Sequence, residues 1–181
     1  DHGKIVMKGK SEDVISAYLQ SLQSHQVLYS REPDKTQPSI TQIEVKTSEA
    51  NQVHVYGKSL QVKVNVNLPK PMPDLALAFQ FVNALGHNIV HAWYFDNVAR
   101  LCNSAGDYEF TCDFPQPKLY KGHYRINAYL ADTSAKTNYD TVNLVCPFEV
   151  TMFGMNRDYE WQENSCAYLE DFNWQTKKLT N

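Results

Sequence analysis

The sequence predicts an all-β protein, an immunoglobulin-like or jelly-roll antiparallel β-sandwich preceded by a short N-terminal helix. Two observations favour this fold class. From Ile40 onward, apolar and polar residues alternate with a period of two, which is typical of strands with one buried face. Turn-forming segments such as PKPMPD and SAGD separate seven or eight such runs, and no helical run lies between them.

Residues 1–24 predict a turn followed by a helix. Ser11 is a good N-cap, and Glu12 and Asp13 follow it in the first turn, where the helix dipole favours negative charge. Apolar residues then recur at helical spacing, namely Val14, Ile15, Tyr18, Leu19 and Leu22. This stripe is expected to pack on the rest of the chain, or alternatively on an upstream domain. The sequence lacks an initiator methionine, so we expect it to be a piece of a longer protein.

Residues 25–39 are polar, contain two prolines and show no sustained period, so they predict a linker. The β-sandwich domain is expected over residues 40–181. Its expected strands, in order, are 40–46, 60–68, 75–83, 89–95, 107–114, 123–131 and 141–152.

Strict alternation also assigns outward-facing residues. Planar amides and a guanidinium can pair with vicinal hydroxyls, and a tyrosine ring can stack on the apolar face of a sugar. The outward residues that predict such a carbohydrate-binding surface are Lys63, Asn65, Asn67, Gln80, Arg125, Asn127 and Tyr129. The alternative is an ordinary polar face, and the alternation does not decide whether these strands are neighbours in one sheet.

Two aromatic stretches need partners. In HAWYFDN, Trp93 and Phe95 share one face of a strand, and we expect them in the core with Tyr94 half exposed. The C-terminal stretch is too aromatic for a disordered tail, so it should dock on its own sandwich or on a partner chain; its aromatic residues are Phe153, Tyr159, Trp161, Tyr168, Phe172 and Trp174.

The charge balance argues against nucleic-acid binding. The chain has 17 Lys and Arg against 20 Asp and Glu, a formal net charge of −3, whereas binding to phosphates needs a basic surface. The four cysteines fit no zinc or redox spacing, and we expect free thiols. His87 and His91 lie four residues apart, but we interpret them as a turn and a strand-edge histidine. We therefore expect no metal and no cofactor in this chain.

Enzyme motifs are missing from the sequence. It contains no phosphate-binding loop, no Gly-x-Ser-x-Gly and no His-Glu-x-x-His. A pair of carboxylates for glycoside hydrolysis would have to come from residues among which no pair stands out: Asp96, Asp107, Glu109, Asp132 and Asp140. We expect a binding domain and not an enzyme.

The order of short motifs resembles a known family. The N-terminal stretch DHGKIVMKGKSEDVISAYLQSL is similar to the end of an ABC-transporter ATPase domain, through His2, Gly3, Lys4, Ile5, Val6, Gly9, Asp13, Val14, Ile15 and Tyr18. The sandwich that follows matches at Leu119, Gly122, Tyr124, Ile126, Asn127, Leu130, Asp132, Phe148 and Val150, and a last strand over 167–172 is closed by Trp174. The chain thus resembles the C-terminal carbohydrate-binding domain of the Wzt-type ATP-binding subunit of O-antigen polysaccharide ABC transporters. The acidic stretch 156–163 departs from that pattern.

The resemblance implies a function. Such domains bind the finished O-polysaccharide without chemistry, often at a modified non-reducing end, before export across the inner membrane. They act in the cytoplasm of Gram-negative bacteria, peripheral to that membrane, and meet the membrane-spanning transporter subunit through the upstream ATPase domain. The resemblance also implies a homodimer that can exchange its final strand. The alternative is a structural dimerisation or regulatory module that binds no glycan.

Overall fold

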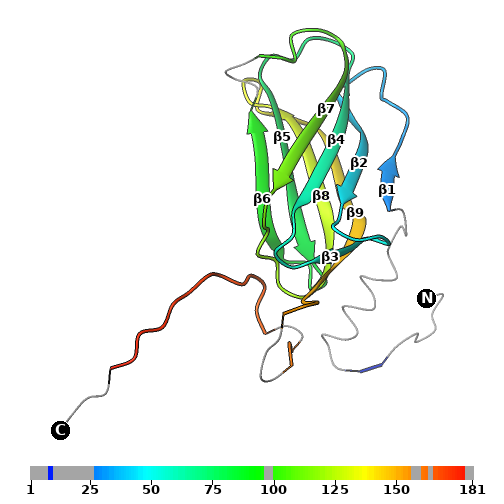
Figure 1. Cartoon of the computed structure of the whole chain (residues 1–181). Helices are drawn as coiled ribbons and strands as arrows, with labels where there is room; N and C mark the ends of the chain where they lie inside the picture. Colours follow the sequence, from blue (N-terminus) through cyan, green and yellow to red (C-terminus); the bar gives the residue numbers. More distant parts are fainter. Residues whose placement is uncertain (1–7, 10–26, 96–99, 156–159, 163–164, 178–181) are drawn as a thin grey trace.

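The computed structural model describes residues 8–9, 27–95, 100–155, 160–162 and 165–177. Within these ranges the chain forms a sandwich of two sheets (Figure 1). The strands are β1 (Leu28–Ser30), β2 (Ser39–Lys46), β3 (Val53–Val55), β4 (Leu60–Leu68), β5 (Leu75–Asn83), β6 (Asn88–Phe95), β7 (Gly106–Phe114), β8 (Gly122–Asp132) and β9 (Thr137–Thr151). The predicted all-β sandwich is confirmed, and the predicted N-terminal helix lies outside the described residues.

The first sheet has the strand order β1-β2-β4-β7, and the second has the order β3-β9-β8-β5-β6. Neighbouring strands are antiparallel except for β3, which runs parallel to β9. The described ranges contain no helix long and apolar enough to cross a membrane.

Most strands begin and end at or within a few residues of the predicted positions, and β4 and β5 match them at both ends. The two strands that alternation missed, β1 and β3, have three residues each, too few to show a period. Strand β1 lies in the range expected to be a linker. Where a last strand was expected over 167–172, the chain forms an isolated bridge from Tyr168 to Leu119.

The core lies between the two sheets and follows the alternation of each strand. The inward-facing residues of β4 are all at most 1% exposed, while their polar neighbours are half-buried. Against them pack the rings of Phe79 and Phe81 from β5, and these contact Phe114 from β7 with ring centroids 5.2 to 6.1 Å apart. Burial of these apolar side chains is the main favourable term in the folding of the domain.

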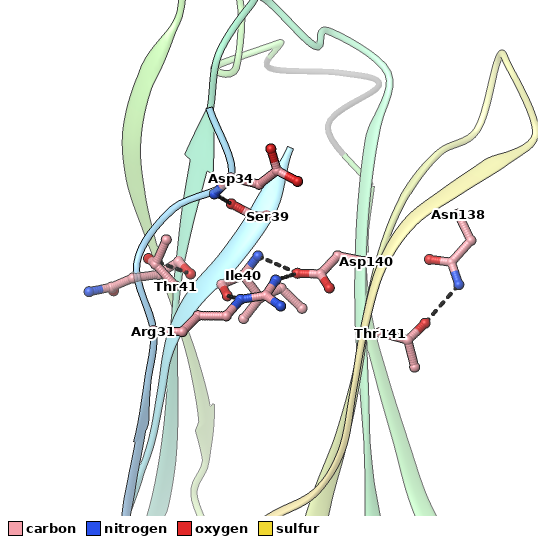
Figure 2. Close-up of polar contacts among 9 residues, drawn as sticks. Arg31, Asp34, Ser39, Ile40, Thr41, Asn138, Asp140 and Thr141 are labelled. Carbon is pink, nitrogen blue, oxygen red and sulfur yellow. Dashed lines mark hydrogen bonds and ion pairs between the residues drawn. The ribbon is translucent and has the colours of Figure 1, made fainter. Parts of the chain in front are cut away.

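An ion pair holds the two sheets together at one end (Figure 2). Asp140 on β9 accepts a hydrogen bond from the backbone N–H of Ile40 at 2.6 Å and forms an ion pair with Arg31. The Nε of Arg31 donates to the carbonyl oxygen of Ile40 at 2.8 Å. Because β1 ends at Ser30, opposite Gln42, it does not reach Ile40, and the two side chains supply the partners that β1 cannot.

His54 on β3 is fully buried, and burial holds its pKa below the ordinary 6.5, while the Glu49 carboxylate acts in the opposite direction. Its Nδ1 accepts a hydrogen bond from the backbone N–H of Ser48 at 3.4 Å, which requires the neutral ring. Below about pH 6.5 the unfolded chain binds a proton at this histidine that the folded chain does not. The free energy of unfolding should therefore fall as the pH drops from 6.5 towards the lowered pKa of the folded state.

Urea unfolding between about pH 7.5 and about pH 5.5 measures this dependence. In His54→Gln the slope against pH should be smaller than in the wild type, whereas Ser134→Gln, a change at an exposed residue that does not titrate, should leave it unaltered. Equal slopes in the wild type and His54→Gln would contradict the prediction.

Candidate functional site

The structure divides the predicted carbohydrate-binding residues between two sheets. Lys63, Asn65 and Asn67 lie on β4 of the first sheet. Gln80 on β5 and the residues predicted on β8 lie in the second sheet. Outward-facing residues of the two sheets point to opposite sides of the sandwich, so the predicted set does not form one site within a single chain.

On the outer face of the first sheet, the polar residues of β4 are bonded to carboxylates of β7. Asn67 donates to Asp107 at 2.7 Å, and Lys63 pairs with Glu109 at 2.8 Å. This hydrogen bond to Glu109 raises the pKa of Lys63, and it lowers the pKa of Glu109. The alternation of β4 gave no sign of these carboxylates, because it could not show that β7, which follows β4 in the chain only after β5 and β6, would be its neighbour.

On the outer face of the second sheet, three strands bring a different set of residues together. The register places Ala78 of β5 between Trp93 of β6 and Tyr129 of β8. The neighbouring rows are His91–Gln80–Asn127 and Phe95–Ala76–Ala131. We call these nine residues the β6–β5–β8 face. Trp93 and Tyr129 lie two strand spacings apart, roughly 10 Å, with only a methyl group between them.

Trp93 presents a large exposed ring on this face. It is 62% exposed, Phe95 is 48% exposed, and Tyr94 points inward to contact the ring of Phe110 at 5.2 Å between centroids. The expectation of a buried Trp93 and Phe95 was wrong. The pairing with β5 sets the parity of β6: because Phe79 faces the core, its partner Ala92 does too, and Trp93 must face outward.

The aromatic and amide groups of the face are arranged by hydrogen bonds and ring contacts. The Tyr129 hydroxyl donates to Oε1 of Gln80 at 3.3 Å, and the rings of His91 and Trp93 lie 5.5 Å apart. These contacts leave the NH2 group of Gln80 to donate to a ligand. A flat apolar ring beside amide and hydroxyl groups can bind a molecule that has one apolar face and a polar edge.

Asn127 has a structural role that alternation could not reveal. Its Oδ1 accepts a hydrogen bond from the backbone N–H of Leu144 at 2.9 Å, where β9 departs from regular pairing and Leu144 has a φ of 53°. Asn127 therefore holds the irregular part of β9 against β8. Its side-chain oxygen is used in this contact, so only its NH2 group can donate a hydrogen bond to a ligand.

Arg125 was expected on the surface, and this expectation was wrong. Its side chain is 8% exposed, and burial lowers the pKa of the guanidinium from its ordinary value. Its partner on β5, Val82, is 3% exposed, so this end of the sheet is covered on its outer side as well. Arg125 cannot present its guanidinium to a large ligand without a rearrangement.

The carboxylates considered for hydrolysis already have partners. Asp107 and Glu109 are bonded to β4, Asp140 to Arg31 and Ile40, and Asp132 accepts from the backbone N–H of Ala135 at 2.7 Å. Asp96 lies outside the described residues. In the described part of the chain, no group of three or more His, Cys, Asp or Glu residues could hold a metal ion.

Comparisons with known proteins agree with the fold. A family model described as the Wzt C-terminal domain matches residues 34–161. The chain is also similar to the crystal structure of the C-terminal domain of Wzt, with a TM-score of 0.51 and 10% sequence identity over 82% of this chain and 90% of that chain. At this identity the structural match shows the fold alone.

Other solved structures match more weakly. A Niemann-Pick type C2 protein from the Japanese carpenter ant has a TM-score of 0.44 and 9% identity, covering 68% of this chain and 99% of that chain. A beta-glucuronidase from glycoside hydrolase family 2 has a TM-score of 0.40 and 14% identity, covering 58% of this chain and 12% of that chain. No curated protein matches the sequence.

Proposed function

The chain belongs to the Wzt C-terminal domain family, and from this premise we propose that it binds O-polysaccharide for export by an ABC transporter, without changing the glycan chemically. The observation that carries the proposal is the row Trp93–Ala78–Tyr129 on the β6–β5–β8 face. The exposed Trp93 ring stacks on the apolar face of a sugar, and Gln80 and Asn127 donate hydrogen bonds to its oxygens.

The charges of this face favour a neutral glycan. Among its nine residues there is no carboxylate, ammonium or guanidinium, and the titratable groups are His91 and Tyr129. The two cations predicted to bind the glycan lie elsewhere or are covered, because Lys63 pairs with Glu109 on the other sheet and Arg125 is buried. We therefore propose that the β6–β5–β8 face binds neutral sugar units, and that recognition needs no metal or other cofactor.

The family supplies the setting of the proposal. In the proposed setting, an ATPase domain precedes this one in the same protein and contacts the membrane-spanning subunit. The domain then acts on the cytoplasmic side of the inner membrane of a Gram-negative bacterium. Glycan binding here selects the finished polymer for export, and hydrolysis of ATP takes place in the upstream domain.

Titration calorimetry of this chain with the O-polysaccharide of its source strain tests the proposal. Polymers with and without their terminal modification are compared, because selective binding of the modified form indicates recognition of the non-reducing end. Micromolar to millimolar affinity per site is expected, since hydrogen bonds to sugars replace hydrogen bonds to water. No heat of binding with either polymer, from a folded sample, would favour the structural module instead.

The C-terminal segment supports a second part of the proposal, a homodimer. The Leu169 N–H donates to the Lys118 carbonyl at 2.9 Å, and the Lys118 ammonium pairs with Glu170 and Asp171, but beyond these contacts the segment leads away from the sandwich (Figure 1). Its side chains Phe172 and Trp174 are 70% and 87% exposed. Rings so exposed on an extended segment favour burial against a second copy of the chain, whether or not the domain binds glycan.

Truncation after Asp171 should weaken this dimer. Removal of residues 172–181 takes away both exposed rings but keeps the pairing of Leu169 with Lys118. Sedimentation of the wild type should show a dimer at concentrations where the truncated chain is monomeric, with a dissociation constant at least about tenfold lower. If both chains have the same mass in solution, the segment does not form the interface.

A further inference from the structure

An apolar pocket of about 360 Å³ opens between the edges of the two sheets, next to β6 and β7. Its walls come from the inward-facing side chains of both sheets, chiefly Val62, Val64, Leu77, Phe79, Ala92 and Phe110. The inward-facing residues of β7 are only half-buried, unlike those of β4, because β6 and β7 are the last strands of their sheets.

The size of one side chain keeps this pocket open. Ala92 of β6 faces the core beside Phe79, and its methyl group fills little of the space between the sheets. The ring contact between Tyr94 and Phe110 closes the gap two residues further along β6. At the mouth lie two exposed apolar side chains, Trp93 at 62% and Leu101 at 65%. An apolar pocket with an apolar rim can bind an apolar ligand.

Volume and shape indicate what fits. Apolar cavities of about 150 Å³ bind benzene, so this pocket holds a larger molecule. Stacked sheets lie about 10 Å apart, and after their side chains are allowed for, the slot between them is one chain thick. A linear alkyl chain meets both conditions, and at the roughly 25 Å³ per carbon atom of benzene in its cavity the pocket has room for up to about 14 carbon atoms.

The charges at the mouth of the pocket indicate what charge the headgroup of a bound amphiphile can carry. Among the described residues that line the pocket, Glu109 alone is charged, and its carboxylate is bonded to Lys63 on the outer face. Because this pair has no net charge, the described lining offers no unpaired ion to an anionic or a cationic headgroup. We propose that the pocket between β6 and β7 binds the alkyl chain of a neutral amphiphile. Trp93 also belongs to the β6–β5–β8 face, so a sugar headgroup on that chain would lie over the face.

Protection of a thiol measures occupancy. Cys112 lines the pocket and is half-buried, whereas Cys166 is exposed and lies outside the pocket. With 1-octanol at about ten times its dissociation constant, iodoacetamide should modify Cys112 about tenfold more slowly, with no change at Cys166. Intact-mass and peptide mass spectrometry follow both thiols in the same sample.

The same protection of Cys112 is measured with octyl β-D-glucoside below its critical micelle concentration and with free glucose. Protection by octanol and by the glucoside supports an alkyl-chain site, and tighter protection by the glucoside indicates that the sugar headgroup also contacts the protein. Protection by the glucoside alone, by glucose, or by none of the three overturns the proposal. None of these outcomes depends on binding of the polysaccharide.

A variant in which a larger side chain fills the pocket provides a second test. Ala92→Leu adds side-chain volume inside the pocket, and Ala135→Leu makes the same change in the exposed turn between β8 and β9. Octanol should raise the Tm of the wild type and of Ala135→Leu but not that of Ala92→Leu. An equal rise in all three chains overturns the proposal, and the thiol measurement on the wild type stands even where Ala92→Leu folds poorly.

Discussion

Replacing Trp93 with alanine is expected to weaken O-polysaccharide binding about 10- to 100-fold while leaving the Tm close to that of the wild type. The ring is 62% exposed, so its removal leaves the core between the sheets intact. In the complex the same ring loses contact with water against the sugar, and buried tryptophans contribute a large share of binding energy in protein interfaces. Calorimetry gives the affinity, and thermal unfolding gives the stability of the same samples.

Two controls separate the face from the rest of the surface. Phe153→Ala removes an aromatic ring that is 82% exposed and lies after β9, outside the β6–β5–β8 face. Lys63→Ala changes a predicted binding residue on the opposite sheet, where it pairs with Glu109. Both variants should bind as the wild type does. Weaker binding in Lys63→Ala together with normal binding in Trp93→Ala would move the site to the first sheet.

The sequence predicts well what depends on one strand at a time. The alternation of β4 and β8 identified which residues of these strands face the core, because side chains in a strand alternate between its two faces. It also gave the bounds of β4 and β5. It could not say that β4 pairs with β7 while β8 pairs with β5, so residues from opposite sides of the sandwich were predicted as one site.

The errors at Trp93 and Arg125 have the same origin. A run of aromatic and β-branched residues such as β6 has no polar face, so its own pattern does not show which side is buried. Its pairing with Phe79 would have shown this, because the core position of Phe79 fixes Ala92 as inward and Trp93 as outward. At Arg125 the alternation correctly assigned the side chain to the outer face of the sheet. Whether it is exposed there depends on what covers the strand, and alternation along one strand carries no information about that.

Replacing Asp140 with alanine is expected to lower the free energy of unfolding by about 2–4 kcal/mol. The side chain is 9% exposed, and its removal leaves the Ile40 N–H without its acceptor and Arg31 without its counter-ion. Arg31 is 38% exposed, so water compensates part of its loss, whereas Ile40 is fully buried and its N–H is out of reach of water. Urea unfolding gives the change in free energy.

The variant Asp140→Asn separates the two contributions. Its amide oxygen can still accept from Ile40, so only the charge on Arg31 loses its partner, and the loss should be about half of that in Asp140→Ala. Asp113→Ala, at a carboxylate hydrogen-bonded to Gln61 on an exposed face, should cost at most about 1 kcal/mol. If Asp140→Ala costs no more than Asp113→Ala, the contact between β9 and β2 does not hold the sheets together. Because Asp140 and Arg31 take the place of a strand at Ile40, we expect their loss to separate β1 and the start of β2 from β9 before the rest of the sandwich unfolds.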